Sequence, residues 1–327
     1  MKELKTLYSD VWYDLAPDLQ LKNFQQILRY FVSPLSEIQE IKQVEHRFMN
    51  QQMTLCEVVI DGLRYVFVPG IKEFQMSYDR DLFTKKNQLL FAINDGSKEL
   101  KVKESQYHKF FDYAYKYTVN RSDTYRIDPM LVSVTALPVS GTPVGYYNMY
   151  DGRKIISTVV NNKFQSELAE FFKTKKETAH FFWRENSLEK VAQVFKKSIL
   201  HPDQLMENFS KRGVNFIDAR EYYYIKSGGA NTFFPWGNSL DPQTVDRLYY
   251  LPNQFGIKIR KDDDNYLMTD NPFRFMDGVV LPEGYLTKYI KYASFFDSGF
   301  VPVHDYFKKP IEEWEMEYRP VIRIKID

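Results

Sequence analysis

The sequence has little cysteine, little excess charge and no long apolar run. Its 327 residues include one cysteine, Cys56, which excludes an intramolecular disulfide, a CxxC redox pair and a zinc site built from several cysteines of one chain. The 44 basic and 43 acidic side chains leave a formal net charge of +1, which argues against a strongly basic nucleic-acid-binding module. No segment reaches the roughly 18 consecutive apolar residues of a membrane-spanning helix. The N-terminus lacks the apolar stretch of a signal peptide, so we expect a cytoplasmic protein, in which a single thiol stays reduced.

The signatures of the common enzyme classes are also missing. Neither GxxxxGKS/T nor GxGxxG occurs, so no glycine-rich phosphate loop is expected, and there is no GxSxG nucleophile elbow. The five histidines are scattered and form no HExxH motif or other close metal-binding pair. Two short stretches, His201 with Asp203 and His304 with Asp305, could still supply an acid–base pair to an enzyme with a divergent site.

Aromatic residues are what the sequence has in abundance. Its 24 Tyr, 26 Phe and 4 Trp make up 17% of the chain, against only 14 Gly. Aromatic side chains bury the largest areas in a core, and they also supply rigid contact area in recognition surfaces. A large core and a specialised binding surface are therefore both open as explanations.

Apolar residues at helical spacing predict several helices. Residues 1 to about 50 are expected to be helical, including a second short helix over 35–42. Further apolar stripes predict helices over 107–117 and 188–199. A proline at the start and a glycine at the end predict another short helix within 202–213.

Strand patterns are clearest in one hairpin. Residues 53–60 and 63–69 alternate around an Asp-Gly pair, the dipeptide that favours a two-residue hairpin turn. Both faces of this hairpin are largely apolar, so we expect it to be covered on both sides, with Cys56 as a buried, unreactive thiol. A closing strand is expected over 318–326. Because helices and strands do not alternate as βαβ units, the predicted class is α+β.

Residues 215–242 differ in kind from the rest of the chain. Asp218 followed three residues later by Glu221 predicts a capping box at the start of a helix, and the paired glycines 228–229 would end that helix. A Phe-Pro-Trp-Gly turn over 234–237 follows, in which proline restricts the backbone on one side of the indole and glycine frees it on the other. Such a turn can hold the indole against a core while it orients the next loop.

This segment resembles the formylglycine-generating enzyme/sulfatase-modifying factor family, whose fold is a variant of the C-type lectin-like fold. The helix with its three tyrosines, the paired glycines and the turn over 234–237 match the order of that family's motifs. Residues 252–257, with the sequence PNQFGI, look like the family's PNxFG segment, and residues 66–70 look like its entrance strand. The resemblance implies a loop-rich C-type lectin-like domain over 53–327, with residues 1–50 as an N-terminal helical segment.

The resemblance does not extend to the family's redox chemistry. Its oxidase members bind copper with a pair of cysteines in the C-terminal half, and this chain has no cysteine after Cys56. Members that oxidise sulfur compounds hold iron on histidines of an N-terminal helical bundle, whereas residues 1–50 contain only His46. The motif that helps to build the family's calcium site is also absent. No cofactor is therefore expected, although the carboxylates of Asp262 and Asp264 would suit calcium.

The function that we expect is binding without catalysis, through aromatic-rich loops. Aromatic rings beside amides suit a protein or carbohydrate partner, and we expect at least half of the rings in this region to be buried. Two alternatives stay open. One is a divergent metal-dependent oxidoreductase of the same superfamily, and the other is an accessory factor, encoded by a bacterial mobile element or phage, that acts on a host protein. The sequence predicts no oligomeric state. The expected ligand contacts are Tyr222, Tyr223, Asn231, Phe233, Phe234, Trp236, Asn238 and Asp241.

Overall fold

The computed structural model describes most of the chain up to residue 239 and short segments beyond it. The described residues form a mixed α and β protein whose strands pair mainly antiparallel, as the predicted α+β class requires. The described ranges are 3–49, 51–95, 104–148, 152, 154–156, 164–174, 176–186, 191–197, 202–239, 251–259, 266–268, 275–276, 293–295 and 316–325. The helical segments are η1 (Glu3–Leu7), α1 (Ser9–Trp12), α2 (Pro17–Phe31), α3 (Arg80–Asp95), α4 (Glu104–Lys116), α5 (Gln165–Thr174), α6 (Pro202–Ser210) and α7 (Ala219–Ser227).

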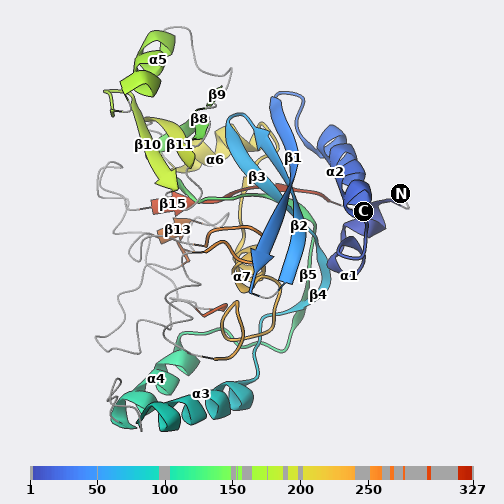
Figure 1. Ribbon diagram of the computed structural model, residues 1–327, viewed down its shortest axis with the longest axis vertical. Helices are drawn as coiled ribbons and strands as arrows, with labels where there is room; N and C mark the ends of the chain where they lie inside the picture. Colours follow the sequence, from blue (N-terminus) through green and yellow to red (C-terminus); the bar gives the residue numbers. More distant parts are fainter. Residues whose placement is uncertain are drawn as a thin grey trace.

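The largest sheet combines strands from both ends of the chain. Its order is β1-β2-β3-β6-β16-β12, and every neighbouring pair is antiparallel. Figure 1 shows α1 and α2 beside this sheet, α5 at one end of the molecule, and α3 with α4 at the other. The strands are β1 (Ile38–Phe48), β2 (Gln51–Ile60), β3 (Leu63–Val68), β6 (Met130–Ser133), β12 (Asn215–Phe216) and β16 (Pro320–Arg323).

The predicted hairpin is confirmed as β2 and β3. Asp61 and Gly62 have positive φ angles of 50° and 77°, as a two-residue turn between twisted strands requires. Neighbouring β2 residues pack on opposite faces, because Leu55 belongs to the core around α7 and Cys56 to the core around α2. The hairpin is thus covered on both sides, as expected. Burial raises the pKa of the Cys56 thiol to about 12, which fits an unreactive thiol.

The N-terminal segment is helical only in its first part. α2 begins at Pro17, where a missing backbone N–H costs no hydrogen bond. Its buried face, which includes Phe24 and Ile27, packs in one core with residues of β2 and β3. The short helix predicted over 35–42 is wrong, because β1 pairs with β2 along its whole length.

A β-bulge explains why β1 has the spacing of a helix. Ile38 lies opposite Ile60 and Ile41 lies opposite Val58, with a register shift between residues 38 and 40. The extra residue brings both β1 isoleucines to the same face of the sheet, so an interval of three arises in a strand. The boundary predicted between an N-terminal segment and the rest, near residue 50, falls at the turn between β1 and β2.

A second sheet, with the order β10-β11-β8-β9, carries α5. The helix predicted over 188–199 is wrong, since β11 pairs with β10 on one side and with β8 on the other. Ala192, Val194 and Phe195 are all buried, so the alternation that marks a half-exposed strand is lost and the short apolar run resembles a helix. The strands are β8 (Gly141–Asn148), β9 (Lys154–Ile156), β10 (Phe181–Asn186) and β11 (Val191–Lys197).

Two smaller sheets contain the other described strands. Their orders are β14-β13-β15-β7 and β4-β5. The strand predicted over 318–326 is divided, because β15 ends at Tyr318 and β16 begins at Pro320. The helices expected over 107–117 and 202–213 are confirmed as α4 and α6. The strands are β4 (Ile71–Gln75), β5 (Thr124–Ile127), β7 (Leu137–Pro138), β13 (Tyr266–Met268), β14 (Phe275–Met276) and β15 (Met316–Tyr318).

Candidate functional site

α7, which carries the predicted motifs, is a core helix. The capping box is confirmed: Asp218 Oδ1 accepts from Glu221 N at 2.8 Å, and Glu221 Oε2 accepts from Asp218 N at 2.8 Å. Arg323 of β16 donates to both carboxylate oxygens of Glu221, at 2.5 and 2.8 Å. Gly228 ends the helix in the left-handed conformation, with φ 64°. Because every residue over 221–227 is buried, α7 beyond its first turn has no face that a ligand could reach, and Arg220 in that first turn is exposed.

The Phe-Pro-Trp-Gly turn is packed against the same core. Phe234 N donates to Gly237 O at 2.9 Å, and Gly237 N donates to Phe234 O at 3.0 Å. The ring of Phe233 stacks on Phe83 of α3 with 3.8 Å between centroids, and the ring of Trp236 stacks on Phe234 at 4.9 Å. The turn therefore joins α3 to the aromatic core around α7.

Four of the predicted ligand contacts are core residues. Tyr222 and Tyr223 are 1% exposed, and Phe233 and Phe234 are 0% exposed, so none of them presents a surface to a ligand in this structure. The expectation that at least half of the rings in this region are buried is confirmed, because these four belong to a set of seven. The other three are Trp236, Tyr249 and Tyr250, of which the two tyrosines lie outside the described residues. Their burial follows from packing between α3, α7 and the loop after α7.

The other predicted site residues are spread or lie outside the described residues. Trp236 is half-buried and Asn231 is exposed. Asn238 is buried and structural, because its Oδ1 accepts from Phe233 N at 2.8 Å and its backbone O accepts from Asn87 Nδ2 at 2.9 Å. The predictions that lie outside the described residues concern Asp241, Asp262, Asp264, His201, His304 and Asp305.

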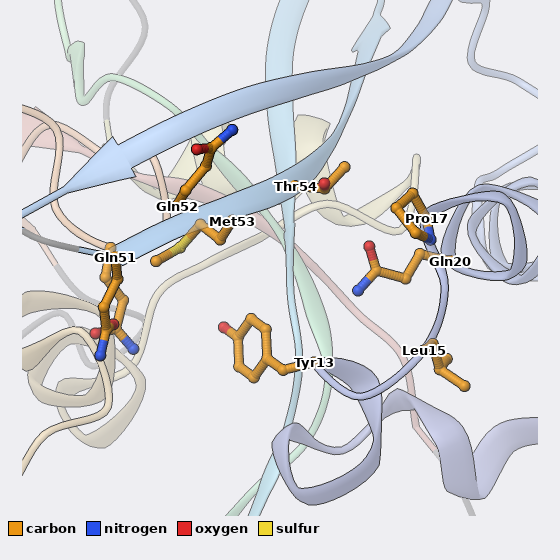
Figure 2. Close-up of a pocket in the computed structure, with 9 residues that line it drawn as sticks. Tyr13, Leu15, Pro17, Gln20, Gln51, Gln52, Met53 and Thr54 are labelled. Carbon is orange, nitrogen blue, oxygen red and sulfur yellow. The ribbon is translucent and has the colours of Figure 1, made fainter.

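A pocket lies at a different place, between the N-terminal helices and the first residues of β2 (Figure 2). Its volume is about 460 Å³. Three separate parts of the chain contribute to it: the segment around the start of α2, the start of β2 and the loop that contains the PNQFGI sequence. Its lining residues are Tyr13, Leu15, Pro17, Gln20, Gln51, Gln52, Met53, Thr54 and Gln254.

Main-chain hydrogen bonds fix the helical side of the pocket. Gln20 is 4% exposed, and its Nε2 donates to Trp12 O at 2.9 Å. Gln43 of β1 donates from Nε2 to Pro17 O at 2.5 Å, which attaches the start of α2 to the large sheet. Tyr13 keeps 39% of its surface exposed, while the atoms around its hydroxyl desolvate it and raise its pKa. The Tyr13 hydroxyl is therefore neutral at physiological pH and can both donate and accept.

The loop side of the pocket depends on Asn253, which precedes Gln254. Asn253 is 4% exposed, and its Nδ2 donates to Ile225 O, near the end of α7, at 2.5 Å. Its Oδ1 accepts from Phe255 N at 3.0 Å and from Ile257 N at 3.2 Å. The side chain of Asn253 thereby closes the loop on itself and ties it to α7.

Two further contacts anchor this loop. His46 Nε2, on β1, lies 2.7 Å from Asn253 O. Arg319, between β15 and β16, is 1% exposed and donates to Ser133 O and Lys258 O, each at 2.6 Å. Burial lowers the pKa of Arg319 to about 10, so the guanidinium stays charged at neutral pH and holds these carbonyls. The walls of the pocket are therefore formed before any ligand arrives.

The chemistry of the pocket is that of neutral polar groups. None of the described residues that line it is charged. Gln20 Oε1 is buried and has no hydrogen-bond partner among the described residues. Amides and hydroxyls both donate and accept, so this set can bind an uncharged polar molecule through hydrogen bonds. The carboxamides are those of Gln20, Gln51, Gln52 and Gln254, and the hydroxyls are those of Thr54 and Tyr13.

This pocket was not predicted from the sequence. The available signals were a glutamine within the apolar stripe of α2, the pair Gln51-Gln52 at the start of a strand and Gln254 inside the PNQFGI segment. Each of these is unremarkable by itself, because exposed glutamines are common. Only their convergence from three segments makes them a candidate site.

Comparisons with known proteins add no relative. No family model, curated protein or solved structure matches the chain significantly. The resemblance to the formylglycine-generating enzyme family stays a prediction. Among the residues that the structure describes, no three His, Cys, Asp or Glu side chains are grouped as metal ligands. None of the described helices has the length and apolar character needed to cross a bilayer.

Proposed function

We propose that this chain is a non-catalytic binding protein and that its glutamine-lined pocket holds a small, uncharged, polar ligand. The observation that carries the proposal is the buried Gln20 Oε1, an acceptor in the pocket wall that no described group satisfies. An unsatisfied buried acceptor costs about 1–3 kcal/mol, so a ligand that donates a hydrogen bond to it gains affinity.

The size and the charge of the pocket support a small neutral ligand. Its volume of about 460 Å³ falls within the roughly 300–1,000 Å³ that is typical of small-molecule sites. A charged ligand would lose its hydration there without meeting an opposite charge on the described lining residues. Because hydrogen bonds already hold Gln20 and the loop of Gln254, few groups have to be ordered when the ligand binds.

We also propose the C-type lectin-like fold for this chain. The support is that the three segments with family-like motifs pack together. Gly229 N, at the paired glycines, donates to Tyr224 O at 3.0 Å, and the Tyr224 ring lies 5.3 Å from the Phe255 ring of the PNQFGI segment. Tyr224 also donates to Pro69 O, in the segment that resembles the entrance strand, at 2.8 Å. An experimental structure with a different strand order from that of this fold would refute the assignment.

The binding proposal is tested by filling the pocket. Thr54→Trp places an indole among the lining residues, and the matched control is Thr124→Trp, at an exposed threonine of β5 outside the pocket. The purified full chain and both variants are titrated calorimetrically with neutral sugars, polyols and small amides, and with acidic and basic analogues of the same size. We expect a neutral compound to bind the wild type and the control variant equally, and to bind Thr54→Trp at least about tenfold more weakly.

Four results would contradict the proposal. Binding that Thr54→Trp leaves unchanged would place the site elsewhere. Binding of charged compounds alone, or of no compound in the panel, would refute a neutral-ligand pocket. Chemical conversion of the bound compound, detected by mass spectrometry, would refute a role without catalysis.

A further inference from the structure

We infer that the pocket's ligand is a neutral polyol of the size of a monosaccharide or a short oligosaccharide, and that Gln20 selects it by accepting a hydrogen bond from one of its hydroxyls. This inference rests on the proposed function, because it names the ligand class of the same pocket. It also assigns to one residue the role of distinguishing a ligand that donates from one that only accepts.

The orientation of the Gln20 amide is set by its surroundings. Its Nε2 donates to Trp12 O at 2.9 Å, and a flipped amide would bring two acceptors, Oε1 and the Trp12 carbonyl, to that distance. Figure 2 shows the Gln20 oxygen on the side of Met53 and Thr54 and the nitrogen on the side of Tyr13. The amide of this lining residue therefore places an acceptor, and not a donor, on the side of Thr54.

A fixed, buried acceptor discriminates more strongly than an exposed one. Gln20 is 4% exposed and its Oε1 has no hydrogen-bond partner among the described residues, so a ligand that does not donate to this oxygen leaves it unsatisfied. Removing the donor from a ligand at such a site lowers affinity by about tenfold or more. Gln51 and Gln52 are exposed, and rotation of their amides can present either the oxygen or the nitrogen. Gln20 is therefore the lining residue with the most selective hydrogen bond.

The rest of the lining matches a polyol better than a flat heterocycle. Each hydroxyl of a polyol donates and accepts, and so do the hydroxyls of Thr54 and Tyr13 opposite. Among the described lining residues Tyr13 is the one aromatic side chain, so a heterocycle finds no second ring there to complete a stacking sandwich. Its half-open ring, with Leu15 and Met53, offers apolar area to the C–H face of a sugar ring.

The experiment uses the full chain and a defined set of probes. The probes are the methyl glycosides of neutral hexoses, together with analogues of each in which one hydroxyl at a time is replaced by methoxy. The methoxy group keeps the acceptor oxygen and removes the donor. Affinity is measured by calorimetry or by ligand-observed NMR. We expect at least one parent glycoside to bind, and one methoxy analogue of it to bind at least about tenfold more weakly.

The protein-side test is Gln20→Leu, with Gln25→Leu as the matched control at an exposed position of the same helix. We expect Gln20→Leu to lower the affinity for the parent glycoside about tenfold. The variant should then bind the parent and the sensitive methoxy analogue equally, which is the signature of a direct contact. The control variant should keep the wild-type preference. If Gln20→Leu fails to fold, the methoxy series on the wild type still decides whether a donor is required.

The outcomes separate this inference from the proposed function. Suppose that a small amide or heterocycle binds, that Thr54→Trp weakens this binding, and that no glycoside binds. The polyol as ligand class would then be refuted, while the pocket would remain a binding site. Glycosides whose methoxy analogues all bind as well as the parent, or a preference that survives Gln20→Leu, would refute the role of Gln20. If no probe shows binding that Thr54→Trp weakens, both this inference and the proposed function are refuted.

Discussion

The sharpest stability test concerns Asn253, whose buried side chain holds the loop on one side of the pocket. In Asn253→Ala, the N–H groups of Phe255 and Ile257 lose their partner, while the carbonyl of Ile225 loses one donor and retains the hydrogen bond from Gly228 N. Each buried group left without a hydrogen bond costs about 1–3 kcal/mol, and water that enters the space of the lost carboxamide recovers part of this. We therefore expect the free energy of unfolding to fall by about 2–4 kcal/mol, a large share of the roughly 5–15 kcal/mol of a typical protein.

The measurement is urea unfolding of the full chain, with Asn231→Ala as the matched control. Asn231 carries the same side chain in the loop after α7 but is exposed, so its truncation should change the free energy of unfolding by less than about 0.5 kcal/mol. Because Gln254 follows Asn253, the destabilised loop should also weaken ligand binding in the pocket. An Asn253→Ala protein that unfolds within about 0.5 kcal/mol of the wild type would refute the idea that this side chain holds the loop.

Two further predictions concern Trp236 and Cys56. Trp236→Phe should unfold close to the wild type, because the indole N–H makes no hydrogen bond within the described residues and the stack on Phe234 is kept. Trp236→Ala should lower the free energy of unfolding by less than the roughly 3–5 kcal/mol of a fully buried indole. If the variant instead lost binding to a ligand or partner with no loss of stability, the ring would be a binding contact. Cys56, whose pKa burial raises to about 12, should not react with an aromatic disulfide reagent at pH 8 until the chain is unfolded in denaturant. Rapid labelling of the native protein would contradict this burial.

Local signals predicted local structure well. The Asp61-Gly62 turn, the capping box of Asp218 with Glu221 and the helix start at Pro202 are all present. Each of these features depends on residues within a few positions of one another, so a short stretch of sequence contains all the information. The same holds for Cys56, whose place in an apolar hairpin predicted a buried thiol.

Longer apolar patterns led to wrong predictions where the tertiary structure changed the spacing of buried residues along a strand. In β1 a bulge puts Ile38 and Ile41 on one face, and in β11 pairing on both sides buries successive residues. Both situations produce the spacing of an amphipathic helix. The information that distinguishes them lies in the partner strands, which the segment itself does not contain.

By itself, the sequence determined the α+β class, the main hairpin, the capped helix α7 and the lack of any cysteine pair. Only the tertiary structure decided which aromatic rings face a ligand and which face the core. Tyr222 and Phe233 are buried because α3, α7 and the loop after α7 pack on one another, and the pocket exists because Gln20 and Gln254 meet beside β2. The physical reason is that burial, and the convergence of polar groups on a pocket, are properties of segments distant in the chain that become neighbours only when the whole core has formed.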